Sequence, residues 1–312
     1  MPRVIRMRRG SAVLAALAMT LAVAGCGGTS LPKDAAATRT RTPSPSASPT
    51  DGDGTLVPPG LDTSSSSDAS AGPVVGADVS WPQCPKGMGI PQKRSQGLPM
   101  PDDSARFVIL GLTNGPSFVA NPCLADQVAW ARARHLWAGA YSVVSYPDPR
   151  TLDRFRHSGP FDGDRTAGAL SNAGYQAALF NIATMKRVGL LTPHVWVDVE
   201  SVPHFPWSAS TAANAAVIRG VVRGYESHGL GVGFYSVLSL WRGVVGELSL
   251  RLPEWRAAGQ TSAEEARARC ESDAWSFNGG TGVIGQWVVG GRDLDITCSA
   301  AGSDLRTWFR QL

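Results

Sequence analysis

Two carboxylates two residues apart are the first feature of this sequence that could do chemistry. Asp198 and Glu200 lie in the run HVWVDVESV, which is otherwise apolar and predicts a buried β-strand. Residues i and i+2 of a strand point to the same side, so the two acids should be presented together. A buried charge is costly unless it has a partner. The pair therefore indicates either buried ion pairs and helix caps or a pair for acid–base catalysis.

The elements that must position these acids are short apolar runs alternating with helical patterns. Near-continuous apolar strands of this kind are typical of a parallel sheet buried on both faces. About eight such units in about 240 residues predict an α/β fold, a (β/α)8 TIM-like barrel, with irregular geometry expected in the last units. An open doubly wound sheet is the alternative, but the G-x-G of GLGVGFY precedes a strand and so fails as a phosphate loop. Strands are predicted at 74–80, 106–113, 136–144, 194–200, 230–237, 252–258, 274–277 and 283–289, and helices at 123–135, 172–189, 210–229 and 262–272, with Gly189 and Gly229 ending two of the helices.

Further acids fall where such a barrel places its active site, at the carboxyl ends of the strands. Asp78 closes the first predicted strand, and Asp293 and Asp295 follow the last one. The first and last strands of a closed barrel are neighbours, so Asp78 and Asp293 should face the fourth strand across the mouth. Converging carboxylates without a basic cluster or metal-binding histidines suggest glycoside hydrolysis. We expect neither a metal nor a cofactor.

The N-terminal residues predict export. MPRVIRMRRG carries four arginines and no acid, and the apolar run SAVLAALAMTLAVAG follows it up to Cys26. This pattern is typical of a signal peptide, and the apolar run is too short to favour a membrane-spanning helix. The stretch VAGC resembles a bacterial lipobox, although an ordinary secretory signal with a chance cysteine is the alternative. We therefore expect residues 1–25 to be a lipoprotein signal peptide and a lipid on Cys26 to anchor the chain to the outer face of the cell membrane.

The segment that follows predicts a tether. Residues 26–73 are rich in Ser, Thr, Pro, Ala, Gly and Asp, a composition typical of disorder. We expect this tether to hold a folded domain, residues 74–312, away from the membrane, and we expect a monomer. The whole chain has a formal net charge of +4, and loss of the four signal-peptide arginines leaves a mature chain with no net charge. That balance argues against nucleic acid as a partner.

The remaining cysteines predict disulfides. An even number of cysteines in an exported chain favours two bridges over metal ligation. The chain has no C-x-x-C pair and no H-E-x-x-H, so zinc is not expected. The four cysteines allow three connectivities, and the barrel order favours the one whose two bridges join neighbouring elements. These are Cys84–Cys123 and Cys270–Cys298.

Ordered motifs point to a family. GADVS, RFVILGLTNG, WAGAYSVVSY, VWVDVE, GVGFYS, LPEWRAA and IGQWVVGGRDLDIT follow one another through nearly the whole domain. In this order they resemble the strand motifs of glycoside hydrolase family 25, the lysozymes that cleave peptidoglycan with a modified barrel. The D-x-E of VWVDVE is the part of the resemblance that carries the acid pair.

The resemblance implies roles for the matching positions. Glu200 would be the general acid that protonates the leaving glycosidic oxygen, with its pKa raised by an enclosed site and acidic neighbours. Asp198 would stabilise the positively charged transition state, while Asp78 and Asp293 would tune these charges and hold substrate hydroxyls. The side chains expected to bind sugar by stacking or hydrogen bonding are Tyr141, Tyr235, Gln286 and Trp287, and Trp81 and Trp207 in Pro-rich loops are further stacking candidates.

The sequence also departs from the family pattern. Ser142 stands where the family's G-A-Y-H has histidine, and Asn114 stands at the acidic position of its K-A-T-E-G. The closing D-L-D leaves Asp293 and Asp295 as alternatives for the last acid, and the D-L register favours Asp293. These changes affect binding positions more than the acid pair. Two functions therefore stay open: a lipid-anchored glycosidase acting on cell-wall peptidoglycan, and a non-catalytic glycan-binding or wall-organising lipoprotein on the same barrel.

Overall fold

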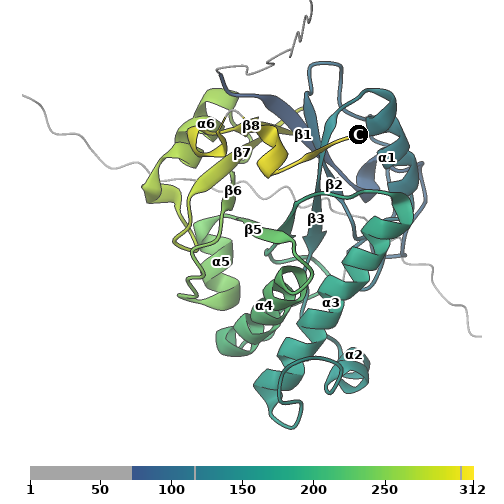
Figure 1. Ribbon diagram of the computed structural model, residues 1–312, viewed down its shortest axis with the longest axis vertical. Coiled ribbons are helices and arrows are strands. Elements are labelled where there is room, and N and C mark those ends of the chain that lie inside the picture. The colour runs from purple at the N-terminus through teal and green to yellow at the C-terminus, as the bar shows by residue number, and fades with distance from the viewer. Residues whose placement is uncertain (1–71, 116, 303) are drawn as a thin grey trace, which may run out of the picture. The chain divides into compact units, whose positions relative to one another are not determined.

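Eight strands close into a barrel (Figure 1) in the computed structural model, which describes residues 72–312 apart from Pro116 and Ser303. The predicted signal peptide, Cys26 and nearly all of the tether lie outside the described residues. Strands β1 to β7 run parallel, and β8 runs antiparallel to both of its neighbours, β7 and β1. The predicted (β/α)8-type barrel is confirmed, with the expected irregularity in its last unit. The strands are β1 (Val75–Val79), β2 (Phe107–Gly111), β3 (Trp137–Val143), β4 (His194–Asp198), β5 (Gly231–Ser236), β6 (Glu254–Ala257), β7 (Gly282–Val289) and β8 (Arg292–Thr297).

The last unit is a hairpin instead of a strand–helix pair. Gly290 and Gly291 join β7 to β8 with φ values of 59° and 75°, and a two-residue turn with positive φ at both positions favours an antiparallel hairpin. The predicted strand 274–277 is wrong, because this segment contains the 3-10 helix η2 (Asp273–Trp275). The predicted strand 283–289 is therefore the seventh strand and not the eighth.

Six α-helices accompany the strands within the described part of the chain. Helix α3 ends at Gly189, which is left-handed with a φ of 71°, as the sequence predicts. No α-helix lies between β1 and β2, where the described chain forms the short 3-10 helix η1 (Trp81–Gln83) and then a long loop. None of the helices in the described residues has the length and apolar character needed to cross a bilayer. The helices are α1 (Leu124–Ala133), α2 (Pro149–Phe155), α3 (Thr166–Val188), α4 (Thr211–Glu226), α5 (Leu238–Val245) and α6 (Ala263–Glu271), of which α2 and α5 were not predicted.

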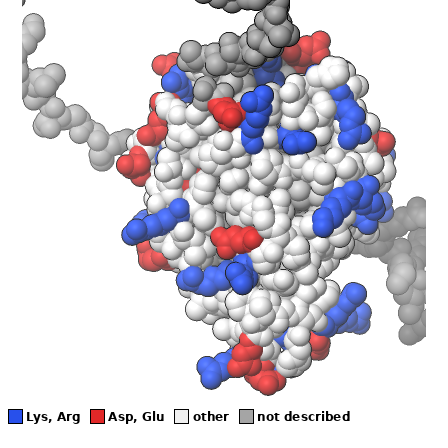
Figure 2. All heavy atoms as spheres, in the orientation of Figure 1, with Lys and Arg blue, Asp and Glu red and all other residues white. Residues whose placement is uncertain are grey.

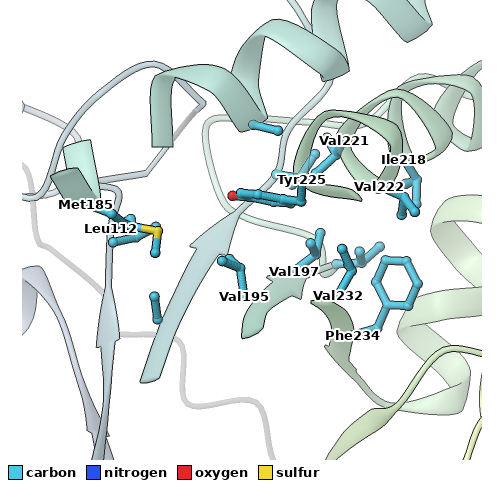
Figure 3. Close-up of a cluster of buried hydrophobic side chains, with 14 of the residues drawn as sticks. Leu112, Met185, Val195, Val197, Ile218, Val221, Val222, Tyr225, Val232 and Phe234 are labelled. Atoms are coloured by element: carbon cyan, nitrogen blue, oxygen red, sulfur yellow. The ribbon is translucent and has the colours of Figure 1, made fainter. Parts of the chain in front are cut away.

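The core between the sheet and its helices is aliphatic (Figure 3). Valines on the outer face of β4 and β5 pack against the inner face of α4, where Tyr225 is fully buried. The Tyr225 hydroxyl is 3.0 Å from Ser142 Oγ and accepts a hydrogen bond from Asn181 at 2.9 Å. Ser142 therefore belongs to the sheet–helix interface. Its difference from the family's histidine lies on the outer face of β3, away from the barrel interior.

Helices α3 and α4 lie side by side (Figure 1) and approach closely because small residues face each other. A Cβ at Gly174 would collide with the carbonyl oxygen of Val217, and a Cβ at Gly220 would collide with that of Ser171. Glycine is required at both positions for this backbone approach.

The barrel interior is layered. Aromatic side chains fill the end where the strands begin, and Phe107 packs against Phe309 with ring centroids 4.7 Å apart. The final strand β9 (Arg310–Gln311) pairs with the start of β3 at this same end. The interior near the carboxyl ends of the strands is polar, and that end holds the acids.

Both predicted disulfides are confirmed. Cys84 pairs with Cys123, and Cys270 pairs with Cys298. The first bridge joins the loop after β1 to the start of α1, and the second joins α6 to the chain that follows β8. On the face shown in Figure 2, lysine and arginine side chains are interspersed with aspartate and glutamate.

Candidate active site

Four predicted acids border one cavity at the carboxyl ends of the strands. Asp78 comes from β1, Asp198 ends β4, Glu200 follows two residues later, and Asp293 lies at the start of β8. The cavity has a volume of about 190 Å³. Cavities of about 540 and 660 Å³ lie elsewhere on the domain, but neither brings such a set of acids together. We take the smaller cavity as the candidate site, because converging titratable groups mark functional sites better than volume does.

A hydrogen-bonded relay crosses the barrel beneath this cavity. The Tyr235 hydroxyl donates to Gln286 Oε1 at 2.8 Å, and Gln286 Nε2 donates to Asp78 Oδ2 at 2.7 Å. Burial, followed by the charge of Glu200, raises the pKa of Tyr235, so this phenol keeps the proton that it donates. The relay fixes the orientation of Asp78 through side chains of β7 and β5.

Burial is the first cause of the shifted pKa values in this cluster. Desolvation, the charge of Asp293 and the charge of Glu200 raise the pKa of Asp78 well above its usual range. Desolvation also raises the pKa of Asp198, and the charges of Glu200 and Asp78 add to it. Each acid therefore favours protonation of the others, as in sites where carboxyl groups share protons.

Glu200 has the properties of a proton donor. Burial raises its pKa, the ammonium group of Lys93 lowers it, and the charge of Asp293 raises it further. A carboxyl group with a raised pKa stays protonated nearer to neutral pH, which a general acid requires. Its backbone is held in place, because Trp207 Nε1 donates to the Glu200 carbonyl at 2.8 Å. Trp207 also packs against the core with part of its side chain exposed, and its role in sugar stacking stays a prediction.

Asp198 offers an oxygen to a ligand. Its side chain is almost completely buried, and among the described residues its Oδ1 has no hydrogen-bond partner. A buried acceptor without a partner is costly unless a ligand or water satisfies it. The carboxylate is therefore placed to interact with a substrate group, such as an amide N–H or a developing positive charge.

The structure distinguishes the two acids of the D-L-D segment. Asp293 and Asp295 both lie within β8 and on the same face of it, two residues apart. Asp293 borders the cavity, whereas Asp295 is 0% exposed and accepts a hydrogen bond from Trp255 Nε1 at 2.8 Å. Burial and the charge of Asp78 raise the pKa of Asp295 well above its usual range. Asp293 is therefore the acid at the cavity, and Asp295 lies deeper in the barrel.

The predicted aromatic contacts divide into two groups. Trp81 and Tyr141 border the cavity, and Tyr235 and Gln286 lie just below it in the relay. The prediction for Trp287 is wrong: its side chain packs on the outer side of the sheet in a cluster with Ala266 of α6. Successive residues of a strand face opposite sides, so Gln286 and Trp287 cannot both face the interior.

Lys93 is a site residue that the sequence interpretation missed. It borders the cavity from the loop between β1 and β2, and its Nζ lies 5.4 Å from the centre of the Trp81 ring. Asn114, at the position of the family's acid, holds this loop: its Oδ1 accepts from Ile90 N at 2.8 Å and its Nδ2 donates to the Lys93 carbonyl at 3.1 Å. A lone lysine in a Gly- and Pro-rich loop gives no signal of this placement in the sequence.

One segment of the chain, which includes part of this site, matches a known protein family. Residues 168–272 match the family model of lysozyme-like protein 1. The matched segment runs from α3 to α6 and includes β4 with Asp198 and Glu200. The lysozyme resemblance of the sequence is confirmed over these residues. Among curated proteins, no sequence matches this chain.

Solved structures with some similarity to this chain include muramidases, a lysozyme and an autolysin. A muramidase from Acremonium alcalophilum is 15% identical with a TM-score of 0.47, over 75% of this chain and 99% of that one. The bacterial lysozyme from Streptomyces coelicolor is 16% identical with a TM-score of 0.47, over 75% and 97%. The modular autolysin LytC from Streptococcus pneumoniae, solved with a synthetic peptidoglycan ligand, is 12% identical with a TM-score of 0.41, over 72% of this chain. The match spans 46% of the LytC chain, which is less than half of its length.

Proposed function

We propose that this protein is a glycoside hydrolase that cleaves the glycan strand of peptidoglycan. The observation that carries the proposal is the convergence of four carboxyl groups on one cavity, the D-x-E pair among them. Buried carboxyl groups with pKa values shifted by their neighbours are the machinery that glycoside hydrolysis uses. The lysozyme-like match over residues 168–272 supports the same reaction class.

In the proposed reaction, Glu200 donates its proton to the glycosidic oxygen as the bond to that oxygen breaks. Asp198 stabilises the positive charge that develops on the sugar, or orients the substrate's own N-acetyl group through its unsatisfied oxygen. Asp78 and Asp293 hold substrate hydroxyls from the opposite side of the cavity, and Trp81 provides an apolar face for a sugar ring. Water then forms a bond to the sugar carbon that the leaving oxygen has left, and its proton goes to the Glu200 carboxylate, which restores the acid.

The test is release of reducing ends from purified peptidoglycan by the purified protein. Glu200→Gln keeps the size of the side chain but removes the proton donor, so we expect turnover to fall at least about 100-fold. Glu264→Gln is the matched control, because Glu264 is exposed on α6 and outside the site. Equal turnover by Glu200→Gln and wild-type protein would refute the assignment. Saturable wall binding without product, retained in Glu200→Gln, would instead support the non-catalytic glycan-binding function.

We further propose that the chain acts outside the cytoplasm as a lipoprotein anchored through Cys26. The signal-like residues 1–25 and the lipobox-like VAGC support this location. Cells expressing the protein should incorporate a radiolabelled fatty acid into it, and Cys26→Ala should abolish the label. Labelling that persists in Cys26→Ala would refute the anchor.

A further inference from the structure

Lys93 brings a positive charge to a cavity bordered by four acids. Its side chain is half-buried beside Trp81, and it makes no ion pair among the described residues. A half-buried ammonium group is screened less by salt than an exposed one. Its charge therefore acts on the nearby carboxyl groups through space.

The fold holds this lysine in place. Asn114 is 0% exposed, and its carboxamide bonds the backbone of the loop on both sides of the turn, at Ile90 and at Lys93. Gly115 has a φ of 100°, and a Cβ there would lie 3.2 Å from Lys93 Cγ. The lysine stem thus packs directly on the chain that follows β2. These contacts hold the loop and the lysine stem at the edge of the cavity.

We propose that Lys93 is a positioning residue that acts through Glu200 and Asp198 to set the pH range in which the site works. This inference rests on the proposed function, in which Glu200 works protonated and Asp198 works ionised. Other titratable groups surround Glu200 and Asp198, and these belong to different elements. They are Asp78 of β1, Asp293 of β8, Tyr141 of β3 and Tyr235 of β5.

The sign of the effect follows from the charges. The ammonium group favours the ionised form of both acids, so it lowers the pKa of Glu200 and of Asp198 against the effect of burial. Loss of the ammonium group should raise both pKa values. Protonated Glu200 then persists to higher pH, and ionised Asp198 appears only at higher pH. Both limbs of the activity profile should move upward together, by about 0.5–2 pH units, the size of shift that one nearby opposite charge produces at intermediate to high dielectric.

The experiment measures kcat/KM on peptidoglycan against pH for three variants. Lys93→Met should move both limbs to higher pH, and Lys93→Arg, which keeps the charge, should restore the wild-type profile. Lys86→Met is the matched control, because Lys86 is an exposed lysine of the same loop and does not border the cavity. Unshifted limbs in Lys93→Met, or the same shift in Lys86→Met, would overturn the proposal. A merely structural role would lower the rate without moving the limbs.

A second measurement does not depend on turnover. Carbon-13 NMR of glutamate-labelled protein follows the carboxyl carbon of Glu200, whose signal is the one missing in Glu200→Gln. Its titration midpoint should be higher in Lys93→Met than in wild type and unchanged in Lys86→Met. If wild-type protein releases no reducing ends, the proposed hydrolysis fails while this titration still decides the role of Lys93. An unchanged midpoint would refute that role even in an active enzyme.

Discussion

Replacing Cys84 and Cys123 together by alanine should reduce both stability and turnover, whereas replacing Cys270 and Cys298 should reduce stability alone. The sequence separations are 39 and 28 residues. The chain-entropy relation gives about 3.9 kcal/mol of stabilisation for the first and about 3.6 kcal/mol for the second. For a domain of this size each loss corresponds to a fall in Tm of roughly 7–16 °C. The two bridges are therefore expected to stabilise the folded domain by nearly the same amount.

Their relation to the cavity differs. Cys84 directly follows the short helix that begins with Trp81, and Trp81 and Lys93 both border the cavity from the chain on either side of this bridge. Cys270 lies in α6 and Cys298 directly follows β8, and neither residue borders the cavity. Loss of the first bridge should displace the loop between β1 and β2, which carries Trp81 and Lys93. A displacement of about 1 Å at a substrate-positioning group lowers turnover by as much as about 100-fold.

The assay combines urea denaturation with turnover at a temperature at which both double variants are folded. We expect similar losses in the free energy of unfolding, and a loss of kcat/KM of at least about tenfold only for the Cys84 and Cys123 pair. Equal losses of kcat/KM in the two variants would show that turnover follows global stability. Full turnover without the first bridge would show that other contacts hold the loop. Either result would refute the reasoning.

Three further predictions concern stability. Glu254 is 0% exposed and pairs with a buried arginine at 2.7 Å, so Glu254→Ala should cost about 3–5 kcal/mol in urea denaturation, while exposed Glu264→Ala should change it by less than about 0.5 kcal/mol. The pKa of Asp295 is raised in the folded state, so wild-type protein loses stability as the pH rises above the pKa of this carboxyl group in the unfolded chain. Asp295→Asn should therefore be more stable than wild type at neutral pH. Thermal unfolding measured across pH should show this difference in stability vanish below about pH 3. Gly220→Ala should lower stability by about 1–3 kcal/mol because α3 and α4 must separate, whereas Gly243→Ala, with open space around it, should be neutral or stabilising by up to about 1 kcal/mol; calorimetry that ranks these two variants in reverse would contradict the close-packing argument.

Periodicity predicted the parallel part of the barrel because the outer faces of these strands are buried against helices. The antiparallel hairpin of the last unit was not predicted, although the sequence contains the signal for it. Gly290 and Gly291 separate two β-rich runs by two residues, which is the hairpin pattern, and Asp293 therefore lies within the eighth strand instead of after it. The short run 274–277 is apolar and therefore predicts a strand, but a run of this length does not distinguish a strand from a helix.

For the site, the sequence predicted the acids but not the cation beside them. The acids stand at strand ends, so the barrel topology alone determines where they meet. Lys93 depends on side-chain contacts with Asn114, 21 residues away, and on a loop whose path no local pattern specifies. Trp287 could have been excluded from the sequence, because its neighbour Gln286 was assigned to the same face and a strand cannot present both.

The antiparallel direction of β8 has a practical consequence for how the protein can be immobilised. Because β8 runs back through the barrel, the chain finishes beside the start of β3, at the same end where β1 begins. A biotin or affinity handle at the C-terminus would therefore attach at the pole opposite the acids. Immobilised in that way, the domain would turn its acidic mouth away from the support, toward an insoluble substrate layered above it.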